Sequence, residues 1–101
     1  MDVLKQQTGS ELLVEISGSI DSGTSPELND NLNESIKGIS TLILDFKKVS
    51  YISSAGLRVL LATFKALSAK GGQMIVRNPN QNVMDIFTIT GFDNILTIEN
   101  K

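Results

Sequence analysis

The segment VSYISSAGLRVLL, from Val49 to Leu61, changes its hydrophobic period in the middle and thereby decides the fold. It begins like a buried strand, passes through the small hydroxyl residues Ser53 and Ser54, and continues with the leucine spacing of a helix. Direct alternation of strand and helix is typical of α/β proteins. The segment also places two hydroxyl groups at the start of a core helix, so we ask what binds or modifies them.

Apolar patterns on both sides of this segment extend the alternation. We expect a short strand beginning at residues 3–4, and further strands at 11–17, 41–46, 73–77 and 94–100, with Gly18 ending the second. The run 41–46 is almost continuously apolar, which is typical of a strand covered on both faces or of one that passes through a core. The predicted order β-β-α-β-α-β-α-β favours one α/β domain over residues 1–101, with a mixed, mostly parallel sheet of about five strands.

Three helices are expected between these strands. The first begins with the capping-box pattern Thr24-Ser25-Pro26-Glu27 and ends at Gly38, and the third is capped by Asn80 and ends at Gly91. The middle helix covers about 54–69. Its core stripe is Leu57, Leu60, Leu61, Phe64 and Leu67, and the third helix turns Val83, Ile86 and Phe87 inward.

Composition and charge exclude several classes of protein. The chain has 101 residues, a net charge of −2 and only nine Lys and Arg, so nucleic acid is not an expected partner. No apolar run reaches the roughly 20 residues that span a bilayer, and the first residues lack a signal-peptide pattern. We therefore expect a cytoplasmic protein that has no membrane partner.

The absence of His and Cys restricts the chemistry further. Neither a Ser-His nor a Cys-His nucleophilic pair can form, and the common zinc sites lack their ligands. A serine without a neighbouring base is a poor nucleophile. We expect a protein that is not an enzyme and has no cofactor or metal.

Two further patterns suggest phosphate chemistry but have simpler explanations. The segment from Gly18 to Ser25 has the glycine spacing of a phosphate-binding loop but lacks its lysine, which favours a tight strand-to-helix turn. Asp45 resembles the phosphoaspartate of a receiver domain. That chemistry needs further acids for magnesium after the first strand, and residues 3–6 offer none, which favours an Asp that bonds to the following backbone.

The pair Ser53-Ser54 has two interpretations on the residues alone. A hydroxyl at this position can cap the helix by accepting a backbone N–H. The same helix start suits a phosphate, and Arg58, four residues after Ser54, could contact it. A second, small apolar face of this helix also has two interpretations, solvent exposure or a docking surface for another protein. It comprises Ala55, Val59, Ala62 and Ala66.

Four segments together resemble the STAS-domain anti-sigma factor antagonists of bacteria over essentially the whole chain. They are the segment Tyr51–Leu57, which is similar to the family's phosphorylation motif, the loop Gly18–Ser25, the segment Gly71-Gly72-Gln73-Met74, and the pattern of Ile86, Phe87, Gly91 and Phe92. Two departures stand out. Ser53 occupies a position where the family often has Asp, and the chain ends soon after the last strand, where the family continues into a helix that would cover more surface.

The resemblance implies a phosphorylation-switched binding protein that is a monomer when free. Ser54 falls on the serine phosphorylated by a kinase that is also the anti-sigma factor, with Ser53 as the alternative, and a PP2C-type phosphatase reverses the modification. The unphosphorylated form would bind the anti-sigma factor and free sigma. The implied partner surface comprises Asp21, Thr24, Ser53, Ser54, Ala55, Gly56, Arg58, Val59 and Ala62.

Other roles remain open on the sequence. A STAS module can serve another assembly, such as a stressosome, a secretion regulator or a lipid transporter. A receiver-like phosphoaspartate domain is the alternative from a different class.

Overall fold

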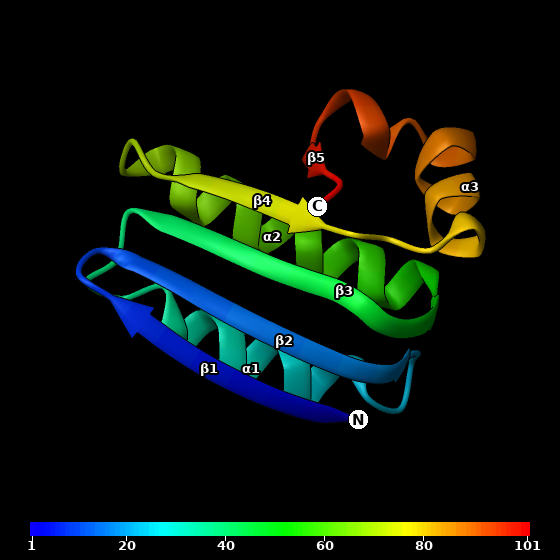
Figure 1. Cartoon of the computed structure of the whole chain (residues 1–101), viewed down its shortest axis with the longest axis horizontal. Coiled ribbons are helices and arrows are strands. Elements are labelled where there is room, and N and C mark those ends of the chain that lie inside the picture. The colour runs from blue at the N-terminus through cyan, green and yellow to red at the C-terminus, as the bar shows by residue number, and fades with distance from the viewer.

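A five-stranded sheet in the order β1-β2-β3-β4-β5 lies at the centre of the computed structural model, which describes residues 1–101 (Figure 1). β1 is antiparallel to β2, and the other neighbours are parallel. The strands are β1 (Asp2–Thr8), β2 (Glu11–Ile20), β3 (Thr41–Ile52), β4 (Gln73–Arg77) and β5 (Thr97–Glu99). The helices are α1 (Ser25–Ser35), α2 (Ser54–Ala69), α3 (Gln81–Thr90) and the 3-10 helix η1 (Phe92–Asn94). The predicted order and the mixed, mostly parallel sheet are confirmed.

Only one face of the sheet carries the main core, so of the two interpretations of residues 41–46 the strand covered by helices on both faces is wrong. α1 and α2 both lie behind the sheet in Figure 1, and the face toward the viewer has no helix over it. Leu42, Leu44 and Phe46 belong to the core cluster, whereas Ile43 on the open face does not. Ile43 is nevertheless only 4% exposed, in a shallow depression lined by Leu13 and by polar side chains of neighbouring strands. A continuous apolar run therefore did not require a second layer of helices.

β2 and β3 both extend farther than predicted. β2 continues through Gly18 to Ile20, and β3 joins the predicted strand 41–46 to the apolar residues Val49 and Ile52 in one strand of 12 residues. The pairing of β2 with β3 shifts register between Glu15 and Ser17 and again between Gly18 and Ser19. Gly18 has a φ of +100°, a conformation available to glycine, so it permits an irregularity where a break was expected.

α2 spans the predicted residues, but one core position was assigned wrongly. Leu57, Leu60 and Leu67 are buried as expected, and Phe64 packs against the core from a half-buried position. Leu61 is half-buried and lies outside the core cluster. Thr63 occupies a core position instead, with 1% of its surface exposed. Its hydroxyl donates to the Val59 carbonyl at 2.9 Å, and this satisfied hydroxyl makes a polar residue acceptable inside.

α3 closes the structure beside the carboxyl-terminal half of β3. Asn80 caps it, as predicted, because its Oδ1 accepts the Val83 N–H at 2.8 Å, and Gly91 ends it with a φ of +79°. The Phe87 ring packs 6.3 Å from the Phe46 ring between centroids. The last strand is shorter than the predicted 94–100, because residues 92–94 form η1 and only three residues pair with β4. No helix combines the length and the hydrophobicity needed to cross a membrane.

Asn80 makes a second bond that ties α3 to the sheet, because its Nδ2 donates to the Val49 carbonyl at 3.0 Å. Asn80→Ala removes both bonds, so we expect it to lower the free energy of unfolding by about 1–2 kcal/mol. Asn82→Ala, an exposed change on the same helix, is the control and should alter stability by less than about 0.5 kcal/mol. Urea unfolding of the three proteins measures this, and equal midpoints for Asn80→Ala and wild type would contradict it.

Candidate functional site

The two serines between β3 and α2 have different structural roles. Ser53 is the N-cap of α2, with extended backbone, and its half-buried hydroxyl accepts the Gly56 N–H at 3.3 Å. Ser54 is the first residue of the helix, and its side chain is exposed. The capping interpretation therefore applies to Ser53, while Ser54 presents a free hydroxyl at the positive end of the helix dipole.

The loop between β2 and α1 is organised by Asp21. Its Oδ1 accepts the backbone N–H groups of Gly23 at 2.9 Å and Thr24 at 3.0 Å. The Ser25 N–H donates to the Asp21 carbonyl at 2.8 Å, four residues back, so the chain is already helical at this point. Asp21 thus acts as the cap of the turn that leads into α1.

The predicted capping box at Thr24 is therefore wrong. Thr24 has helical backbone angles and makes no side-chain cap. Its hydroxyl accepts the Asp21 N–H at 2.9 Å, and its one proton is shared between the Ser19 carbonyl at 2.9 Å and Asp21 Oδ1 at 3.2 Å, which fixes the shape of the loop. Because the Thr24 hydroxyl is already bonded to the Asp21 N–H and the Ser19 carbonyl, it does not cap the first N–H groups of α1.

Hydrogen bonding changes the proton affinity of Asp21. The Thr24 backbone N–H has the largest effect, and together with the Gly23 N–H and the Thr24 hydroxyl it outweighs the opposing effect of partial burial. These donors favour the carboxylate and hold the pKa of Asp21 below its usual value. The Asp21 side chain is therefore ionised at neutral pH and occupied by its own loop.

The loop and the helix start are held together through Ile20. The Ser53 N–H donates to the Ile20 carbonyl at 2.8 Å, which joins the end of β2 to the cap of α2. Gly56 packs so closely that a Cβ atom there would lie 2.7 Å from both the Ile20 Cγ2 and the Ile52 Cγ1 atoms. Only a residue without a side chain lets α2 approach the two strand ends this far.

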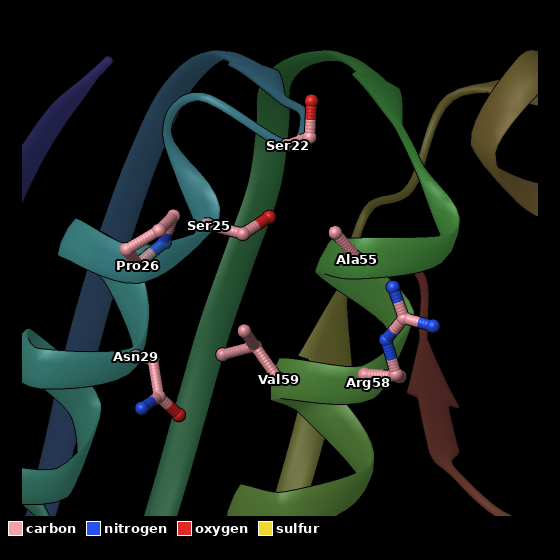
Figure 2. A pocket seen from close by; sticks show the side chains of 7 residues that line it. All are labelled: Ser22, Ser25, Pro26, Asn29, Ala55, Arg58 and Val59. Carbon is pink, nitrogen blue, oxygen red and sulfur yellow. The ribbon is translucent and has the colours of Figure 1, made fainter.

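A groove runs between α1 and α2 beside Ser54. Its volume is about 310 Å³, and Figure 2 shows the side chains of both helices along it. The lining residues are Ser22, Ser25, Pro26, Asn29, Ala55, Arg58 and Val59. Pro26, Ala55 and Val59 supply apolar surface, while Arg58 stands at the edge with an exposed side chain. None of the lining residues pairs a nucleophile with a base.

The structure brings most of the predicted site residues to one end of the molecule. Ser54, Arg58 and Ala62 are exposed, and Ala55 is half-buried. Val59 is only 8% exposed and belongs to the core, so the small apolar face is interrupted and Val59 forms part of the groove lining. Gly56 is buried and acts through packing. Ser22, Pro26 and Asn29 line the groove without having been predicted, and their only signal in the sequence was their spacing from the loop into the start of α1.

Neither the glycine-spaced loop nor Asp45 has the geometry that its phosphate-related interpretation needs. In the glycine loop, the N–H groups of Gly23 and Thr24 are taken by Asp21, so they do not point toward a ligand. Gly23 lacks a positive φ, and a Cβ there would lie 3.3 Å from Asp21 Oδ1, which is why a small residue fits. Asp45 lies within β3 and accepts the Lys47 N–H at 2.9 Å, as the local interpretation predicted.

Comparison with known proteins identifies the family. Residues 2–101 match the STAS domain. The chain belongs to the STAS domain family. It is 32% identical over 96 residues to the anti-sigma-B factor antagonist of Bacillus subtilis (strain 168), covering 95% of this chain and 88% of that protein. It is also 32% identical over 91 residues to the putative anti-sigma factor antagonist BtrV of Bordetella bronchiseptica, covering 89% and 78%.

Solved structures share the fold of this STAS domain. The unphosphorylated form of the anti-sigma factor antagonist SpoIIAA superposes with a TM-score of 0.84 at 20% identity, over 96% of this chain and 87% of that one. The phosphorylated form of Bacillus SpoIIAA gives a TM-score of 0.76 at 19% identity, over 96% and 90%. An anti-sigma factor antagonist from Mycobacterium paratuberculosis gives 0.87 at 24% identity, over 97% and 84%. At these identities the likeness establishes the fold.

The close packing at Gly56 predicts a sensitive position. Gly56→Ala places a Cβ against two buried isoleucines, so we expect a loss of about 1–3 kcal/mol in the free energy of unfolding. Ser54→Ala, an exposed change two residues away, should change stability by less than about 0.5 kcal/mol. Thermal and urea unfolding measure the difference, and a Gly56→Ala protein as stable as wild type would show that α2 does not depend on this contact.

The lowered pKa of Asp21 predicts a pH dependence with a definite sign. A depressed pKa in the folded state contributes stability above the ordinary aspartate pKa of about 3.9, and this contribution is lost as the pH falls through the folded value. In Asp21→Asn the acid-side slope of stability should therefore be shallower than in wild type. NMR titration of the Asp21 carboxyl tests the cause directly, and a midpoint at or above the ordinary value would contradict it.

Proposed function

We propose that this STAS domain is an anti-sigma factor antagonist whose binding is switched off by phosphorylation of Ser54. The observation that carries the proposal is the exposed Ser54 hydroxyl at the first residue of α2, in a frame held by the Ser53 cap and the Ile20–Ser53 hydrogen bond. Curated relatives at 32% identity carry the name of anti-sigma factor antagonist. SpoIIAA, which has the same fold, has been solved in unphosphorylated and phosphorylated forms.

Geometry favours Ser54 over Ser53 as the phosphoacceptor. The Ser53 hydroxyl is half-buried and accepts the Gly56 N–H, so modifying it would displace the helix cap. Ser54 bonds to nothing through its side chain and can enter a kinase active site without local unfolding. The small neighbours Ala55 and Gly56 let a partner approach the backbone closely.

In this proposal the unphosphorylated domain binds a cytoplasmic anti-sigma factor, which is also its serine kinase, and sigma is released. A phosphate on Ser54 adds about −1.5 to −2 charge at the centre of the contact and loses its hydration there, which dissociates the complex. A PP2C-type phosphatase restores the hydroxyl. The domain itself catalyses no reaction. It acts by binding its partner in one state of Ser54 and not in the other.

The partner surface in this proposal surrounds Ser54. Ala55, Arg58 and Ala62 extend it along α2, and Val59 forms part of the adjoining groove lining. Asp21 and Thr24 belong to the neighbouring loop, which adjoins this surface. The ionised Asp21 carboxylate fixes the shape of the loop by accepting two of its N–H groups. Ser53 and Gly56 contribute by fixing where α2 begins.

Phosphorylation of serine variants by the anti-sigma factor kinase of the source organism tests the assignment. We expect the phosphate on Ser54 in wild type, its loss in Ser54→Ala, and its retention in the matched variant Ser53→Ala, which leaves the acceptor in place. Peptide mass spectrometry locates the phosphate, and titration calorimetry compares both forms for kinase binding. Phosphate on Ser53 in the Ser54→Ala protein would contradict the site, and equal affinity of both forms would contradict the switch.

A further inference from the structure

Arg58 is a cation without an ionic partner at the site. The ion pairs of the structure are Lys37–Glu34, Arg77–Glu99 and Lys101–Glu99, all of them away from α2. α2 contains two cations, Arg58 and Lys65, and no acid, so nothing on its own helix neutralises Arg58. An exposed, unpaired guanidinium costs little in the free protein and is available to an anion from outside.

The Arg58 side chain extends toward the first turn of α2. Figure 2 shows its guanidinium directed along the helix toward the turn that carries Ala55. Side chains on helices point toward the N-terminus, and residues four apart lie one above the other, so Arg58 can reach a group on Ser54. The guanidinium also stands at the edge of the groove between α1 and α2. One cation at the groove therefore also lies four residues from Ser54, on the same side of the helix.

We propose that Arg58 binds a carboxylate of the partner before phosphorylation and the phosphate of Ser54 after it, and that this exchange is part of the switch. The inference rests on the proposed function. In the unphosphorylated domain, Arg58 binds an Asp or Glu of a partner segment whose apolar side chain enters the groove against Pro26 and Val59. In the modified domain, the phosphate on Ser54 binds Arg58 within the same helix, so the groove loses its cation.

The chemistry of the two anions supports this order of preference. A phosphoserine carries more charge and more acceptor oxygens than a carboxylate, and a guanidinium binds it with two parallel hydrogen bonds. The phosphate is also on the same helix, so it needs no association step, unlike a partner carboxylate. Modification thus weakens binding twice, by placing negative charge in the contact and by withdrawing the one positive group that faced the partner.

The intramolecular half can be tested without a partner. Domain carrying phosphoserine at position 54 is titrated by phosphorus NMR as wild type, Arg58→Ala and Lys65→Ala, the last removing an equal charge from α2 seven residues further along. A guanidinium that binds the dianion lowers the second pKa of the phosphate, so Arg58→Ala should raise it while Lys65→Ala leaves it close to wild type. Equal phosphate pKa values in wild type and Arg58→Ala would overturn the exchange.

The binding half uses the unphosphorylated domain and the anti-sigma factor kinase. We expect Arg58→Ala to weaken binding about tenfold or more, and Lys65→Ala to stay within about twofold. Ser54→Asp should cost less affinity in the Arg58→Ala background than in wild type, because the cation it would withdraw is already absent. Unchanged affinity of Arg58→Ala, or equal costs in both backgrounds, would overturn the docking role. A kinase that binds every form but never modifies Ser54 would instead contradict the proposed function. The NMR titration would still decide separately whether Arg58 binds a phosphate on Ser54.

Discussion

The close approach of Gly56 to Ile20 and Ile52 is the constraint on which the site depends. A helix of leucines could pack on this sheet in several positions, but only a residue without a side chain allows the first turn of α2 to rest on the ends of β2 and β3. The Ser53 N–H then bonds to the Ile20 carbonyl, and the following residue, Asp21, begins the loop into α1. One packing contact thereby sets the relation between the exposed hydroxyl of Ser54 and the loop that begins at Asp21, far earlier in the chain.

Polar groups at this end of the molecule are divided between structure and recognition. Nearby backbone groups are hydrogen-bonded to the side chains of Asp21, Thr24 and Ser53, and these bonds hold the loop and the helix start in place. Ser54 and Arg58 make no such bonds and face solvent. In the proposed switch, a phosphate on Ser54 would meet a frame whose own polar groups are already satisfied, so the charge of the surface would change without a change of fold.

The family resemblance and the structure point to Asp21 for different reasons. The resemblance implies that the loop contributes to partner contact, while the structure shows its carboxylate engaged with Gly23 and Thr24. A loop shaped by an ionised side chain presents its backbone and its neighbours in one conformation. Lower conformational freedom before binding reduces the entropy lost on binding, so a residue that bonds inward can still matter for a partner.

The amino-acid sequence by itself determined the order of elements, the span of α2, the cap at Asn80 and most of the core, because these follow from local periodicity and from backbone N–H groups that need acceptors. It left open which of Ser53 and Ser54 caps α2, and the structure assigns that role to Ser53. Tertiary structure decided the rest. Gly18 continues β2 because pairing with β3 tolerates a bulge there, Thr63 replaces Leu61 in the core because its hydroxyl finds a carbonyl, and Asp21 takes the capping role predicted for Thr24. The groove between α1 and α2 was also beyond prediction, since it combines Pro26 and Asn29 with Val59 and Arg58. Residues on separate helices become neighbours only because both helices pack on a common sheet. The sequence pattern of one helix contains no information about its distance from the other.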